Sequence, residues 1–158
     1  MIANSTLHHK NSWRRVLPLL LAVLAWILFW YRDTGLAMVA IWGRSETYTH
    51  AFIVPPISLW LIWRKRHELA LLQPAPTLWL VLPIAATTLF WLMGELTAVN
   101  ALTQTALVVT LILATVSVLG LRVSREIAFP LAFLLFCIPI GDFMLPRLMD
   151  WTASFTVF

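Results

Sequence analysis

Three side chains that can exchange protons or hydrogen-bond a substrate lie at alternate positions in the first third of the chain: Glu46, Tyr48 and His50. Because an imidazole ordinarily titrates at about pH 6.5, His50 has the chemistry to move protons or orient a nucleophile. A lone histidine at the edge of an apolar segment can equally be a hydrogen-bonding interface residue, and tyrosine is common at membrane interfaces. We therefore take Tyr48 and His50 as candidate substrate-binding or site-lining residues and expect Glu46 to be solvated.

Two consecutive prolines, Pro55 and Pro56, follow within the apolar part of the same stretch. Each lacks an N–H, so a helix through this stretch leaves the carbonyls of Ala51 and Phe52 without their usual partners. In apolar surroundings such carbonyls must face protein or water. The prolines therefore predict a structural kink, which forms either a polar niche one turn from His50 or an ordinary kink satisfied by neighbouring helices.

The single cysteine, Cys137, lies among apolar neighbours in the run LLFCIPIG. A reactive thiol needs nearby cations or a helix N-terminus, and neither is local, so Cys137 is expected to be inert. Asp142 follows this run, either as a solvent contact at a helix end or as a further lining of the outer niche. No metal-binding spacing, nucleophile elbow or phosphate loop occurs, so we expect no metal, no cofactor and no complete catalytic constellation.

The composition indicates that these groups lie in or beside a bilayer. The chain is 61% hydrophobic and 11% charged, with a mean hydropathy of +0.86, whereas about a quarter of a soluble domain is charged. Its net charge of +4 comes from short clusters of cations between apolar runs. Such clusters are typical of the loops on the cytoplasmic side of a membrane protein, so they do not indicate nucleic-acid binding. The expected partners of the cluster Arg64, Lys65 and Arg66 are anionic lipid headgroups.

The lengths of the apolar runs predict an all-α, polytopic transmembrane helix bundle. The unbroken apolar run 57–63 covers only about 10 Å as a helix, but 47–66 covers about 30 Å and can cross. The prolines must then lie inside that span. We expect a polar leader over 1–15 and a single transmembrane domain over 16–158, with spans at roughly 16–31, 47–66 (kinked), 77–93, 102–121 and 127–146.

Two shorter segments complete this scheme. The run 35–42 is too short to cross and is expected in the interface or as a small packed outer element, and a terminal interfacial or truncated helix begins at Arg147. Loops rich in cations alternate with loops that have few, which places the N-terminus in the cytoplasm. Glu46, Tyr48, His50 and Asp142 then face the outside.

Two stretches of the chain resemble the exosortase family, in particular exosortase A. The first is W-x-x-S-E-T-Y-T-H-A-F-I-V-P-P-I-S-x-W-L-I-W-R-K-R over 42–66, and the second is R-E-I-A-F-P-L-A-F-L-L-F-C-I-P-I-G-D-F over 125–143. We call them the first and second blocks. Together with the span pattern, the resemblance covers nearly the whole chain. Ala51 stands where relatives commonly have glycine.

The resemblance implies a multi-pass inner-membrane cysteine peptidase or transpeptidase of Gram-negative bacteria. Its implied substrates are exported proteins that end in a PEP-CTERM sorting signal, in systems that accompany exopolysaccharide production. The catalytic Cys, Arg and His of the family lie in its later half, and none has a counterpart here. On this interpretation the chain is an N-terminal fragment that forms a scaffold, with no catalytic residue of its own, and is inactive alone. A transporter fragment and a non-catalytic membrane subunit of polysaccharide export remain alternatives.

Overall fold

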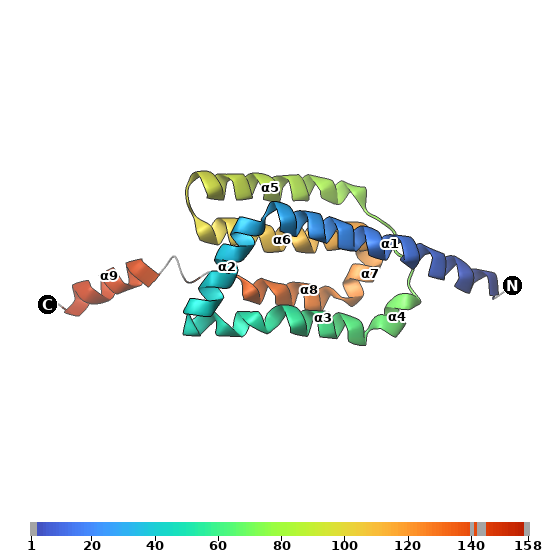
Figure 1. Cartoon of the computed structure of the whole chain (residues 1–158), viewed down its shortest axis with the longest axis horizontal. Helices are drawn as coiled ribbons and strands as arrows, with labels where there is room; N and C mark the ends of the chain where they lie inside the picture. The colour runs from blue at the N-terminus through green and yellow to red at the C-terminus, as the bar shows by residue number, and fades with distance from the viewer. Residues whose placement is uncertain (1–2, 140, 142–144, 157–158) are drawn as a thin grey trace.

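The computed structural model describes residues 3–139, 141 and 145–156, and these form α-helices and short 3₁₀-helices (Figure 1). The all-α prediction is confirmed. The chain runs back and forth along one long axis, and each reversal brings a new helix beside an earlier one. In order, the elements are α1 (Ala3–Trp30), α2 (Arg32–Arg44), η1 (Glu46–Phe52), α3 (Val54–Arg64), α4 (Arg66–Ala70), η2 (Leu78–Leu80), α5 (Val81–Leu96), α6 (Asn100–Leu119), α7 (Leu121–Glu126), α8 (Ala128–Phe133), η3 (Leu134–Cys137) and α9 (Leu145–Thr156).

In the part of the chain that the structure describes, three stretches of helix are long and apolar enough to cross a bilayer: Ser12–Trp30, Leu78–Leu96 and Asn100–Leu119. They coincide with the first, third and fourth predicted spans. The polar leader is continuous with the first of them, because α1 begins at Ala3. At 20 residues, α6 is about 30 Å long, which matches the hydrocarbon thickness.

The second predicted span is built differently from a single kinked helix. The 3₁₀-helix η1 ends at Phe52, and the α-helix α3 begins at Val54 with Pro55 and Pro56 in its first turn. The first N–H groups of a helix have no internal partner, so proline costs nothing there. The interruption expected at the prolines is therefore a change of helix type immediately before them.

The fifth predicted span is shorter than the expected 127–146. The apolar helix covers Ala128–Cys137, and Ile138 then adopts an extended backbone with φ −80° and ψ 121°. The residue before a proline is driven to this region by the ring of the following residue, here Pro139. The short α3 and α8 pack side by side (Figure 1).

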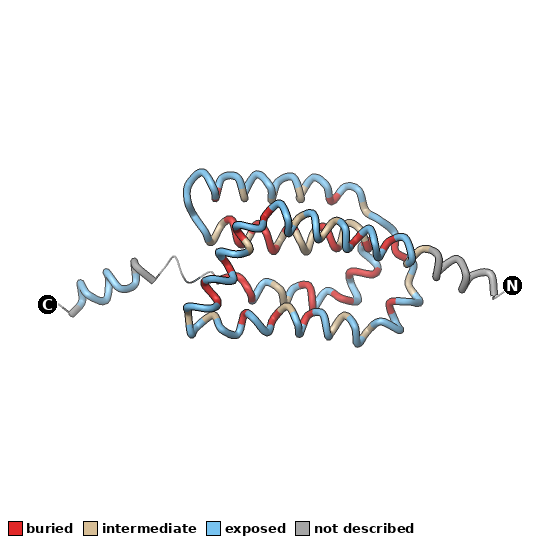
Figure 2. Tube along the Cα trace, in the orientation of Figure 1, coloured by how far each residue is buried: buried red, intermediate tan, exposed pale blue. Residues whose placement is uncertain are grey.

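Helix α6 lies at the centre of the bundle, in contact with α1, α2 and α5 (Figure 2). Hydroxyl groups link the helices around it: Thr110 on α6 lies 3.0 Å from the Thr87 hydroxyl on α5, and Trp91 donates to the Thr34 hydroxyl at 3.0 Å. Hydroxyl side chains commonly form hydrogen bonds between helices that pack together in a membrane. The outer faces of α1 and α5 expose large apolar side chains, as lipid-facing surfaces do.

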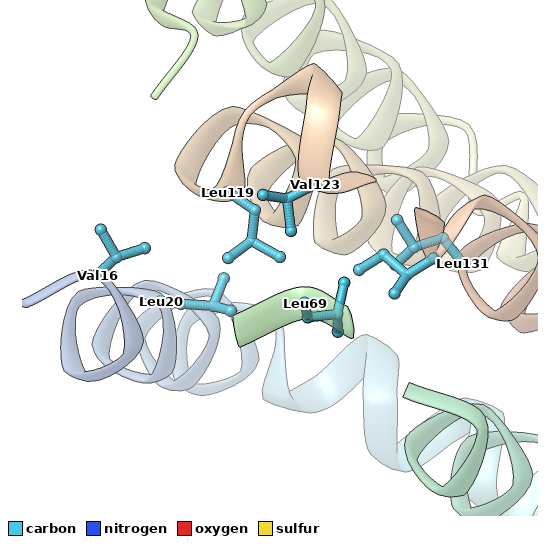
Figure 3. Close-up of a cluster of buried hydrophobic side chains, with 7 residues drawn as sticks. Val16, Leu20, Leu69, Leu119, Val123 and Leu131 are labelled. Carbon is cyan, nitrogen blue, oxygen red and sulfur yellow. The ribbon is translucent and has the colours of Figure 1, made fainter. Parts of the chain in front are cut away.

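Two apolar clusters close the ends of the bundle. We call the end with α4 and α7 the basic end, since Arg64, Arg66, Arg122 and Arg125 lie there; the opposite end, with α2 and η1, is the α2 end. At the basic end a cluster joins α1, α4, α6, α7 and α8 (Figure 3), consisting of Val16, Leu20, Leu69, Leu119, Val123, Ile127 and Leu131. At the α2 end the cluster consists of Met38, Trp42, Ala51, Val54, Val108, Cys137 and Ile138. The short apolar run 35–42 is thus a packed outer element within α2.

Candidate functional site

The 3₁₀-helix η1 carries Tyr48 and His50 on different faces. A 3₁₀-helix has about three residues per turn, so residues three apart lie on one side. Tyr48 and Ala51 share the inner side, where Ala51 has no exposed surface and Tyr48 packs against the cluster at the α2 end. His50 lies on the outer side and is exposed. The imidazole is therefore accessible, while the phenol is held in place by packing.

The hydroxyl of Tyr48 lies directly over Gly141. A Cβ added to Gly141 would lie 2.5 Å from that oxygen, closer than a methyl carbon approaches a non-bonded oxygen. Glycine therefore permits Tyr48 to reach the backbone of the second block. Asp142 is the next residue, but it lies outside the described residues, so its predicted role at the outer face stays a prediction.

Trp42 makes the second link between the two blocks. Its buried indole N–H donates to the carbonyl of Cys137 at 2.9 Å, and its ring meets Phe52 edge-on with centroids 5.3 Å apart. The first residue of the first block is thus bonded to the second block. Sequence reasoning missed Trp42 as a positioning residue, because nothing in the sequence separates it from the other eight tryptophans except its place in the block.

Cys137 is packed as a structural residue. Only 4% of its surface is exposed, and its thiol donates to the carbonyl of Leu134 in the preceding turn at 2.8 Å. A free cysteine in such surroundings behaves as a small apolar side chain. The geometry agrees with the expectation that this thiol is inert.

The α2 end therefore brings η1, which carries Tyr48 and His50, close to the segment at Gly141, although the two are far apart in the sequence. Pro55 and Pro56 lie in the first turn of α3, which follows η1 directly. The exposed imidazole of His50 can bind or orient a polar segment, while Tyr48 on the inner side of η1 is held by packing. Among the described residues, it provides no accessible thiol.

The model of the transmembrane exosortase family matches residues 42–158, which is more than half of the chain. The match begins at Trp42, the first residue of the first block, and includes both blocks. The comparisons with curated proteins and with solved structures gave no significant match. The resemblance stated from the two blocks is confirmed, and the chain belongs to the transmembrane exosortase family.

Proposed function

We propose that this chain is the membrane scaffold of an exosortase that cleaves PEP-CTERM sorting signals from exported proteins by cysteine peptidase or transpeptidase chemistry. Membership of the family supports the reaction class. The observation that carries the scaffold role is the packing of the first block on the second, through Trp42 of α2 to Cys137 and Tyr48 of η1 to Gly141. That packing holds one wall of a site in a fixed position.

In this proposal Tyr48 and His50 bind the polar segment of the substrate that emerges from the membrane. Tyr48 is held by packing and supplies a surface, and the exposed imidazole of His50 supplies a hydrogen bond. Neither is assigned as the nucleophile. Cys137 is not assigned either, because a buried thiol bonded to its own helix has no path to a peptide bond.

We further propose that the α2 end faces the outside of a bacterial inner membrane and that the basic end faces the cytoplasm. The cations of the basic end support this orientation, because short cytoplasmic loops carry an excess of Lys and Arg. Exported substrates would then meet Tyr48 and His50 as their transmembrane helices arrive in the bilayer. Systems that make exopolysaccharide are the expected setting.

A processing assay tests this proposal. The longest reading frame that contains the chain is co-expressed with a tagged exported protein that ends in a PEP-CTERM signal, and the cleaved fraction is measured by immunoblot. We expect His50→Ala to lower the cleaved fraction about tenfold, the effect of losing a hydrogen bond to a charged or strongly polar group. His67→Ala at the basic end is the matched control, since this histidine is also exposed.

Cys137→Ala belongs in the same assay and is expected to leave processing unchanged at equal protein level. Wild-type processing by His50→Ala would reduce His50 to a scaffold residue. If Cys137→Ala abolished processing at equal protein level, the thiol of Cys137 would have to be assigned a catalytic role. No cleavage by the wild-type reading frame would contradict the peptidase proposal and favour a non-catalytic membrane subunit.

A further inference from the structure

A pocket lies at the basic end of the bundle, lined by residues from the junction of α3 with α4 and the junction of α7 with α8. Figure 1 shows these two junctions at the same end of the bundle. Its volume is about 340 Å³, within the range of about 300–1,000 Å³ that is typical of small-molecule sites. Leu61, Phe129 and Pro130 give it apolar walls. Because this pocket lies at the opposite end from Tyr48 and His50, it is separate from the site described above.

One edge of the pocket is an ionic link between segments far apart in the sequence. The ammonium of Lys65 donates to the backbone carbonyl of Glu126 at 2.8 Å and lies 3.8 Å from its carboxylate. Both side chains are about half exposed, so the pair is weak in itself. The pair connects the end of α3 to the junction of α7 and α8 along one edge of the pocket.

The two remaining charged residues of the lining, Arg64 and Glu68, form no ion pair among the described residues. Arg64 ends α3 and Glu68 lies in the short helix α4, so the turn at Lys65 separates these opposite charges. The guanidinium of Arg64 instead lies over the ring of Trp60, 5.6 Å from its centroid. The pocket therefore presents a cation and an anion at separate places, each without a charged partner.

The pocket lies at the level where lipid headgroups would contact the protein in a bilayer. Arg66 lies over Trp63, 4.1 Å from the ring centroid, and exposed tryptophan and arginine together mark the boundary between hydrocarbon and water. An anionic headgroup would satisfy Arg64 and Lys65 but would oppose the carboxylates of Glu68 and Glu126. A headgroup with both a phosphate and a primary ammonium would satisfy both signs of charge.

We propose that this pocket binds the headgroup of an ethanolamine phospholipid, with the phosphate on Arg64 and Lys65 and the ammonium on Glu68. The apolar walls would hold the glycerol and the first acyl carbons. The sequence alone predicted anionic headgroups at Arg64, Lys65 and Arg66, and the two carboxylates in the same pocket are the reason for the different choice. The inference does not depend on the proposed peptidase reaction.

Native mass spectrometry of the whole chain in detergent tests the proposal. The protein is offered equal amounts of phosphatidylethanolamine, phosphatidylcholine and phosphatidylglycerol with identical acyl chains. We expect phosphatidylethanolamine to be retained over both others. The trimethylammonium of phosphatidylcholine donates no hydrogen bond, and phosphatidylglycerol has no cation for Glu68.

Glu68→Gln should lower the ratio of retained phosphatidylethanolamine to phosphatidylglycerol about tenfold, the effect of losing a charge-assisted hydrogen bond. Glu95→Gln removes the same charge from the α2 end, where Glu95 is exposed, and should leave the ratio unchanged. Equal retention of the two lipids by the wild-type protein, or equal effects of both variants, would overturn the proposal.

A second pair of variants protects the test against a Glu68 variant that fails to fold. Arg64→Gln should lower the retention of phosphatidylethanolamine by a similar factor. Arg66→Gln, which removes a neighbouring cation outside the pocket lining, should not. Equal losses for Arg64→Gln and Arg66→Gln would show a diffuse basic surface and would overturn the specific site.

Discussion

At the residue scale, two contacts decide how the candidate site is built: the indole of Trp42 on the Cys137 carbonyl and the phenol of Tyr48 over Gly141. Each joins the first block to the second, so the blocks that carry the family resemblance form one structural unit. The exposed His50 depends on this unit for its position, although its own side chain is on the outer face of η1. Trp42 is thus a positioning residue only, whereas Tyr48 is both a positioning residue and a candidate binding residue.

The contact between Tyr48 and Gly141 is testable by a double-mutant cycle. Gly141→Ala places a methyl group 2.5 Å from the Tyr48 hydroxyl oxygen, and overpacking of this kind costs about 1–3 kcal/mol. Tyr48→Phe removes the oxygen and should recover most of that loss. Thermal unfolding of the four purified proteins in one detergent measures the coupling. If the two substitutions prove additive, the contact is absent.

At the element scale, glycine and proline decide where helices end. Pro55 and Pro56 start α3 instead of bending it, and Pro139 stops the fifth pass early. Gly120 makes the junction between α6 and α7 with φ +85° and ψ 158°, a backbone conformation that is essentially restricted to glycine. Its N–H bonds the carbonyl of Val116 at 2.8 Å, which closes the last turn of α6.

Gly120→Ala is expected to destabilise the bundle by at least about 2 kcal/mol, from backbone strain and overpacking together. The added Cβ would overlap the carbonyl of Ala75, a backbone group that cannot rotate away. The thermal midpoint in detergent is the readout. Gly43→Ala in α2 is the matched control, since a Cβ there meets no atom within 4 Å and alanine favours a helix. Equal midpoints for the two variants would contradict the assigned role of Gly120.

At the scale of the whole molecule, the bundle has two chemically different ends. The basic end has Arg64, Arg66, Arg122 and Arg125 together with the pocket of about 340 Å³. The α2 end has η1 and the segment at Gly141, and Figure 1 shows α2 and α4 at opposite ends of the bundle. Successive passes of the chain alternate between these ends, as the positions of the cationic loops predicted. One accessibility measurement at each end of the bundle therefore assigns every loop that joins two passes to one side of the membrane.

Cysteine labelling provides that measurement. Glu46→Cys at the α2 end and His67→Cys at the basic end replace exposed residues, each in a Cys137→Ser background. A membrane-impermeant maleimide added to intact spheroplasts should label position 46 and should label position 67 only after permeabilisation. The reverse pattern would place the N-terminus outside and would move Tyr48 and His50 to the cytoplasmic side.

The sequence by itself determined that the chain is an all-α membrane protein and that its cationic loops gather at one end. These follow from local composition, because the free energy of placing a residue in lipid depends mainly on that residue and its near neighbours. The first, third and fourth spans agree with the helices to within a few residues. The sequence also indicated Tyr48 and His50 as candidate binding residues, from their types and their place before the apolar run, and this role stays a prediction.

Only the tertiary structure decided what these residues touch. The partners of Trp42 and Lys65 lie 95 and 61 positions away along the chain, and apolar helices show no polar face in the sequence that would indicate which side packs inward. For the same reason the sequence did not reveal α6 as the central helix or the mixed charges of the pocket at the basic end. Long-range contacts depend on how whole helices pack, and that information is distributed over the bundle.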